Sequence, residues 1–290
     1  MNKKKNALLV SVLGISMALT SLTGCGSTGA TKDPKTLLTT ASENFATTKS
    51  YDINLDMVMV MDMKDQGKLD MTMHSTGNVI QSPELAYKLN SSVDMKMGDQ
   101  NQTFETIQYV VKEDSDYIMY MNTMDMWTKT HMASAEDVEK MLKSPAANLD
   151  VFLEKIDDIS IAEELNIEGT DCYSIKLNLT KDCFDAVLDE MDLLSNMGVD
   201  EDTLKQTVDT LKDIDSLPVY YYVSKENTQL VGMDMDMSSL LKTVLLSSED
   251  LTEDQLGDIK TTMHMTVSNF DNVPEIVLPE EAASATEIQM

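Results

Sequence analysis

Histidine side chains are the residues of this chain most suited to metal binding or acid–base catalysis. There are three, His74, His131 and His264, and their spacing matches no metal-binding motif. Each lies on the polar side of an alternating segment, as a solvent-exposed histidine would. The sequence has no Gly-x-Ser-x-Gly elbow, no Gly-rich phosphate loop and no His-Glu-x-x-His pattern. We therefore expect no catalytic residue, no metal site and no cofactor.

Carboxylates and thioethers offer two weaker routes to a cation. Asp234 and Asp236 would share one face of a strand, where they could bind a cation weakly. Calcium sites usually draw their oxygen ligands from a folded loop, which favours a solvated face instead. The Met-x-Met repeats could suggest Cu(I), which prefers thioether ligands. Alternation would bury those sulfurs without a nearby His or Cys, so we do not expect a copper site.

The N-terminus predicts export from the cytoplasm. A basic start (Lys3 to Lys5) precedes an apolar run over residues 7–22, which is short for a membrane-spanning helix. An exported chain can form disulfides, and Cys172 and Cys183 lie close enough in sequence to allow one. We expect Cys172 on the polar side of its strand and Cys183 in the first turn of the helix that follows. No second pair indicates a disulfide framework, so we expect free thiols, although the sequence does not decide between the two states.

The apolar run ends in a motif that suggests lipidation. Leu22-Thr23-Gly24-Cys25 resembles the lipobox of bacterial lipoproteins. That resemblance implies that Cys25 receives a diacylglyceryl thioether, with palmitate-type acyl chains, and becomes the first residue of the mature protein. We therefore expect a lipid anchor on the extracytoplasmic face of the cell membrane. Residues 1–24 would be the signal peptide and residues 25–33 a tether.

The composition excludes some partners. The chain has 22 basic and 50 acidic residues, all the basic ones being Lys, and a net charge of −28. Such a surface repels phosphate backbones, so we expect no nucleic-acid binding. The chain also has 24 Met but only five Phe and one Trp. Flexible, polarizable methionines suit an adaptable apolar surface, and they equally suit a core in which Met replaces Leu.

A period of two predicts the sheet that must position these side chains. Between residues 51 and 97, apolar and polar residues alternate over long stretches. This pattern predicts strands with one apolar and one wet face, and short turns between them favour antiparallel pairing. The predicted strands lie at about 51–63, 68–80, 84–97, 102–111, 115–121, 125–132, 159–167, 173–179, 217–224, 228–237 and 259–270.

Helical patterns interrupt the strands. A helix of about four turns should begin at Pro34, with Asp33 as its N-cap. Further helices are predicted at 135–143, 148–156, 180–196, 199–214 and 238–246. No linker divides the chain, so we expect a single α+β domain over residues 34–281. Its centre would be one strongly curved antiparallel sheet, a half-barrel of about 10–11 strands, with helices packed on its concave apolar face. Residues 282–290 would be a frayed tail.

Several sequence features, taken in order, carry a family resemblance. After the lipobox and first helix come long Met/Asp strands, Asp171-Cys172-Tyr173 after a Gly turn, the segment Leu217 to Val223, and a strand leading to Asn269-Phe270. This order resembles a family of Gram-positive lipoproteins of unknown function, similar to the LolA/LolB and LppX-type half-barrel superfamily. The resemblance implies a bent open sheet that holds acyl chains beneath helices. It brings no catalytic residue, and lipoprotein sorting is not implied for a single-membrane envelope.

Together these features predict a non-catalytic lipoprotein that binds a lipid or other apolar ligand between sheet and helices. The expected lining is rich in methionine, namely Met57, Met59, Met71, Met73, Met95, Met235 and Met265. One alternative is an envelope protein-interaction or sensor module with a filled core, whose helical insert over residues 181–214 contacts a partner protein. An enzyme ranks third, since no catalytic constellation is present in the sequence.

Overall fold

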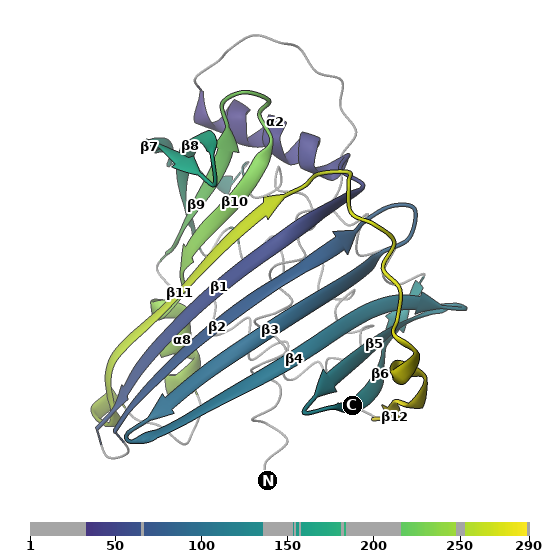
Figure 1. The fold of residues 1–290 in the computed structure, drawn as a ribbon. Coiled ribbons are helices and arrows are strands. Elements are labelled where there is room, and N and C mark those ends of the chain that lie inside the picture. The colour runs from purple at the N-terminus through teal and green to yellow at the C-terminus, as the bar shows by residue number, and fades with distance from the viewer. Residues whose placement is uncertain are drawn as a thin grey trace.

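The computed structural model describes residues 33–64, 67–135, 153, 155–156, 158–180, 183, 216–247 and 253–288. Its main feature is one curved, unclosed sheet of twelve strands, in the order β12-β6-β5-β4-β3-β2-β1-β11-β10-β9-β8-β7 (Figure 1). Every pair of neighbouring strands is antiparallel except β12 and β6. The predicted α+β class with a single half-barrel-like sheet is confirmed.

The strands follow the alternating segments of the sequence closely. They are β1 (Ser50–Met63), β2 (Gly67–Ile80), β3 (Ala86–Met97), β4 (Gln100–Glu113), β5 (Asp116–Thr123), β6 (Met126–Ser134), β7 (Ile159–Ile167), β8 (Thr170–Leu179), β9 (Leu217–Ser224), β10 (Leu230–Asp236), β11 (Leu256–Ser268) and β12 (Thr286–Glu287). Each of the eleven predicted strands has a counterpart, and β12 is the additional one. A short 3₁₀ turn, η3 (Glu253–Gln255), precedes β11.

Two helices are described in full, and both were predicted. Helix α2 (Pro34–Ala46) begins where Asp33 Oδ2 accepts a 2.9 Å hydrogen bond from the backbone N–H of Thr36. Its buried side, including Phe45, packs against the apolar face of the sheet. Helix α8 (Ser238–Ser247) follows β10 and lies beside β11 (Figure 1). Both helices therefore cover the concave side, as expected.

The strand register defines two faces of the sheet. The inner face carries Leu55, which lies opposite Met265 on β11 and Ser75 on β2. The outer face carries residues such as Asp56. The main core lies on the inner face of β1 and β8–β11, where buried residues from these strands and from α2 form one cluster. Burial of this apolar surface is the main force that holds the helices on the sheet.

The outer face is less uniformly polar than alternation predicts. Cys172 is fully buried in a second apolar cluster with Tyr222 and Val231, although its position was expected to be on the wet side of its strand. Side chains from β7, including Leu165 and Ile167, pack against this cluster and exclude water from the thiol. The expectation of an exposed polar position at Cys172 is therefore corrected.

The C-terminal segment also differs from the frayed tail expected for residues 282–290. It runs down the side of the sheet to η4 (Glu280–Ser284) and β12 (Figure 1). Ala282 is buried against Tyr109 and Tyr120, and β12 pairs with β6 in parallel. The backbone N–H of Ile288 donates to Lys129 O at 2.9 Å. These apolar and backbone contacts hold residues 282–288 in place, where fraying was expected because they lie near the end of the chain.

Some predicted elements lie outside the described residues. These include the signal peptide, most of the tether and the helices at 180–196 and 199–214, of which only Thr180 and Cys183 are described. Of the helices at 135–143 and 148–156, the structure describes Ala135, Leu153 and 155–156. None of the helices in the described ranges is long and apolar enough to cross a membrane.

Candidate ligand-binding face

The register brings all seven methionines of the predicted lining to the inner face of five adjacent strands. Met57 lies opposite Met73 on β2 and Met263 on β11. In the next row, Met59 lies opposite Met71, which in turn lies opposite Met95 on β3. Directly opposed side chains on one face of a sheet contact each other. The seven methionines therefore share one face of the sheet.

Burial divides these seven residues into two groups. Met57, Met235 and Met265 are 6%, 4% and 3% exposed and belong to the main core, with Met73 packed against it. The three buried methionines support the fold and offer little surface to a ligand, whereas Met73 is half-buried at the edge of this core.

The other three, Met59, Met71 and Met95, are half-buried, as are their inner-face neighbours Leu69 and Val93. We name these five residues the methionine floor. They lie at the end of the inner face where β1 runs into β2 (Figure 1). The floor is thus continuous with the core without being part of its fully buried cluster.

A row of small polar side chains crosses the inner face beyond the core. Ser75, Ser91 and Thr106 lie opposite one another on β2, β3 and β4. Ser75 is almost fully buried, and its hydroxyl lies 2.7 Å from that of Ser91. On the far side of the row, Tyr87 belongs to another apolar cluster, which also contains Val110 and Tyr117 and is separate from the cluster around Cys172. The sequence signal for this row was the change from Met to Ser at inward positions.

The electrostatics of the floor suit an uncharged ligand. No inward position of β1, β2 or β3 carries an acidic or basic side chain. Burial on this face raises the pKa of Tyr51 to about 12, and burial also raises the pKa of Tyr87 well above its ordinary value. A surface of this kind interacts through apolar contact and dispersion, without ionic recognition.

Five positions considered from the sequence, three histidines and two aspartates, lie on or beside the outer face. His74, His131 and His264 are about half exposed, as expected. Asp234 and Asp236 do not act as a pair: Asp234 bonds Tyr222 and His264, whereas Asp236 accepts from the backbone of Ser238 at 2.9 Å. The two carboxylates therefore have different hydrogen-bond partners.

The two described cysteines lie on opposite faces of the sheet. Cys183 belongs to the main core, and Cys172 to the outer cluster. Both are buried free thiols in the structure. Burial raises the pKa of the Cys172 thiol, which disfavours the reactive thiolate. The position of Cys25, the predicted lipidation site, lies outside the described residues with Leu22, Thr23 and Gly24.

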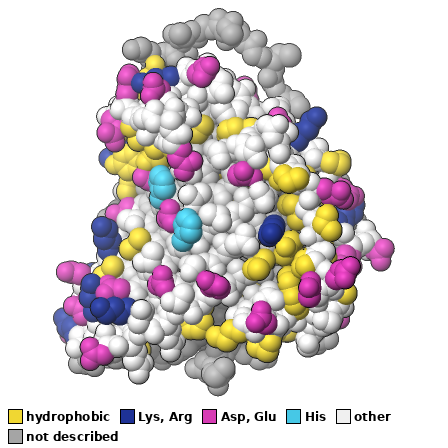
Figure 2. Space-filling view, in the orientation of Figure 1, with side chains coloured by type: hydrophobic (Ala, Val, Ile, Leu, Met, Phe, Trp, Pro, Cys, Tyr) yellow, Lys and Arg dark blue, Asp and Glu magenta, His cyan; other side chains and the backbone are white. Residues whose placement is uncertain are grey.

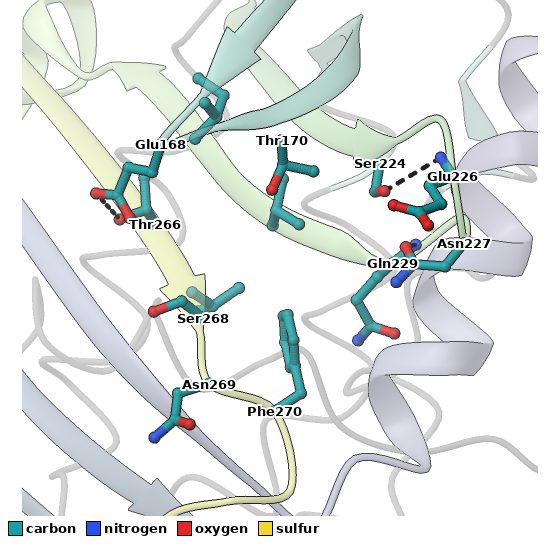
Figure 3. Close-up of a pocket in the computed structure, with 13 residues that line it drawn as sticks. Glu168, Thr170, Ser224, Glu226, Asn227, Gln229, Thr266, Ser268, Asn269 and Phe270 are labelled. Carbon is teal, nitrogen blue, oxygen red and sulfur yellow. Dashed lines mark hydrogen bonds between the residues drawn. The ribbon is translucent and has the colours of Figure 1, made fainter.

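A separate pocket of about 260 Å³ opens where two hairpins meet the end of β11 (Figure 3). It is lined mainly by polar residues of the turns, with Glu168 and Glu226 as its acidic groups and Phe270 as its aromatic ring. Several of its polar atoms bond one another, for example Glu226 N–H to Ser224 Oγ at 3.3 Å. No sequence pattern predicted this pocket. Its lining is mainly polar, whereas the methionine floor is apolar.

Comparison with known proteins gives a family. A family model described as "Family of unknown function (DUF6612)" matches residues 33–287. No curated protein matches the chain. The match agrees with the predicted resemblance to a family of unknown function.

Solved structures of low sequence identity are also similar. LprF from Mycobacterium bovis is 13% identical, with 87% of this chain and 98% of that chain covered and a TM-score of 0.43. The lipoprotein LppX from Mycobacterium tuberculosis is 12% identical, with 85% and 100% covered and a TM-score of 0.44. A DUF1329 family protein from Desulfovibrio piger is 12% identical, with 86% and 96% covered and a TM-score of 0.22.

Proposed function

We propose that this chain, which belongs to the DUF6612 family of unknown function, binds a lipid acyl chain or a similar apolar molecule on its methionine floor. The observation that carries the proposal is the half-buried state of Met59, Met71 and Met95 beside a tightly buried core. A surface filled only by its own side chains would favour Leu, Ile and Phe, whose rotamers are better defined. Methionine instead suits a surface that must accept several shapes.

The proposal also assigns a location. Cys25 would carry the lipid anchor, and residues 25–33 would form a short tether to the domain, which begins at residue 34. The lipobox-like motif supports this assignment, and the family match begins at residue 33, the last residue of the proposed tether. The protein would then be a non-catalytic component of the cell envelope, held at the membrane from which an apolar ligand could be taken.

The test uses a chain that starts at residue 26, since the described fold begins only at Asp33. Native mass spectrometry followed by organic extraction should reveal a co-purifying lipid. After delipidation, a fluorescent fatty acid should bind saturably. Protein that purifies without lipid and binds no apolar probe would contradict the proposal and favour an envelope protein-interaction module.

A further inference from the structure

The central row of the methionine floor ends at a buried hydroxyl group. On the inner face, Met95, Met71 and Met59 lie opposite one another on β3, β2 and β1, and Thr261 on β11 lies opposite Met59. Thr261 is only 3% exposed. Among the residues that the structure describes, its Oγ1 atom has no hydrogen-bond partner. Three thioether side chains therefore lead across adjacent strands to one unpartnered polar atom.

The start of α8 does not supply the missing partner. The backbone N–H of Thr261 donates to Ser238 Oγ at 2.9 Å, and the Ser238 hydroxyl donates in turn to Asp236 Oδ1. The backbone carbonyl of Thr261 accepts from the N–H of Met237 at 2.8 Å. These bonds use the backbone of Thr261 and leave its hydroxyl unpaired. A buried hydroxyl without a partner is destabilising, and native structures contain few such groups.

This hydroxyl lies next to the surface that the proposed ligand would cover. Met59, directly opposite, is half-buried, so Thr261 lies one side chain away from the floor. A methionine side chain has three rotatable bonds, so Met59 can change rotamer and admit a polar atom of a ligand to the hydroxyl. A ligand that lies across the row from Met95 to Thr261 would span three strand spacings, roughly 14 Å.

Charge limits what that polar atom can be. Acidic, basic and histidine side chains are spread over the outer face (Figure 2), whereas the inward positions of β1, β2, β3 and β11 carry none. Lys242, the one basic residue of α8, bonds Glu253 Oε1 at 3.1 Å. An ionised carboxylate beside Thr261 would lose its hydration without meeting a basic side chain on these strands, which is costly. A neutral carbonyl oxygen needs only a donor, and the Thr261 hydroxyl provides one.

We infer that the ligand of the methionine floor is an uncharged acyl ester whose carbonyl oxygen accepts a hydrogen bond from Thr261 Oγ1. This inference rests on the proposed function and adds the chemical class of the ligand. The hydrocarbon chain lies on Met59, Met71 and Met95, and the ester group lies at β11. An ionised fatty acid binds through its chain alone, with its carboxylate turned to water, and therefore binds more weakly.

Paired titrations test this assignment on the delipidated chain that starts at residue 26, which contains every described residue of the fold. The probes are cis-parinaric acid, a fluorescent fatty acid, and its methyl ester, both at submicellar concentration and at about pH 8, where the acid is ionised. The ester should bind about fivefold more tightly, as expected for one hydrogen bond between neutral groups. Thr261→Val should weaken ester binding about fivefold and change acid binding less than about twofold.

Thr262→Val is the matched control. Thr262 follows Thr261 on β11 and lies on the outer face, opposite Val58 on β1. This variant makes the same chemical change away from the floor and should bind both probes as the parent does. Thr261→Ser keeps a hydroxyl and should keep the preference for the ester. The urea midpoint of ligand-free Thr261→Val should equal or exceed that of the parent, because valine replaces an unpartnered hydroxyl with an apolar group of the same shape.

The outcomes separate this inference from the proposed function. If neither probe binds to the parent, both are overturned. If both probes bind but the acid binds as tightly as the ester, or if Thr261→Val weakens ester binding no more than Thr262→Val does, the inference alone is overturned. A lower urea midpoint for Thr261→Val would also overturn it, since the hydroxyl would then stabilise the fold without a ligand.

Discussion

Replacing Met71 with aspartate should abolish most of the affinity for an acyl chain. Met71 lies between Met59 and Met95 in the central row of the methionine floor. A carboxylate at this position would face the bound ligand directly. The fold should tolerate the change, because Met71 is half-buried and does not belong to the fully buried core cluster.

The size of the effect follows from two contributions. Asp lacks the end of the methionine side chain, and each buried CH₂ group contributes about 0.8 kcal/mol of apolar contact. Desolvating an unpaired polar group costs roughly 1–3 kcal/mol more in proteins. Together these suggest a loss of about 3 kcal/mol, which corresponds to a dissociation constant roughly 100-fold higher. Met71→Leu keeps the apolar surface and should change affinity only slightly.

Thr72→Asp is the matched control. Thr72 is the next residue on the same strand, is exposed and points to the outer face, so the variant adds the same charge without touching the floor. Titration with a fluorescent fatty acid measures affinity, and urea unfolding confirms that each variant remains folded. If Thr72→Asp weakened binding as much as Met71→Asp, charge alone would explain the loss. If Met71→Asp bound like the parent, the ligand would lie elsewhere.

Four further predictions concern anchoring, thiols and stability. Cys25→Ala should release the protein from the membrane fraction or stall its processing, and an unchanged processed, membrane-bound form would contradict lipidation. Thiol counting on denatured, unreduced mature protein should give two groups, Cys172 and Cys183; a count of zero would mean that they are bridged. Phe45→Ala should destabilise the fold by about 3–5 kcal/mol in urea unfolding, because it leaves a cavity under α2. Stability should fall as pH rises from 10 to about 12, because burial raises the pKa of Tyr51 to about 12 in the folded chain, while the pKa of the unfolded tyrosine stays near its ordinary value of 10.0; an unchanged urea midpoint at pH 8 and 11 would contradict this.

The strands could be predicted because their evidence is local. In β1, an apolar residue occupies every second position from Ile53 to Met63, most of the residues between them are polar, and a period of two permits only one assignment of faces. The start of α2 could be predicted equally well, since Asp33 is a favourable N-cap and Pro34 is favoured at the first helical position. Such signals need no knowledge of the rest of the chain. This is why each of the eleven predicted strands has a counterpart in the structure, and why both fully described helices were predicted.

The pairing of distant strands has no local signal. β1 lies next to β11, so His264 meets Asp56 although nothing in either segment indicates the other. The histidines were therefore judged singly from the sequence, as isolated surface residues. Likewise, Cys172 was assigned to a wet face because alternation cannot show that Leu165 covers it. The order of strands, and the segments that lie on each face, decide such environments.

Met57 and Met59 show that an alternating pattern predicts the face on which a side chain lies but not its burial. They occupy equivalent positions in the same strand, and the sequence predicts the same lining role for both. Met57 lies opposite Met263 and is buried in the core. Met59 lies opposite Thr261, whose backbone N–H bonds Ser238 Oγ at 2.9 Å where α8 begins. A small polar neighbour at the helix start takes the place of a core methionine, so Met59 remains half-buried. Alternation determines which face a side chain occupies, but its cross-strand neighbour influences whether it is buried in the core or left half-buried.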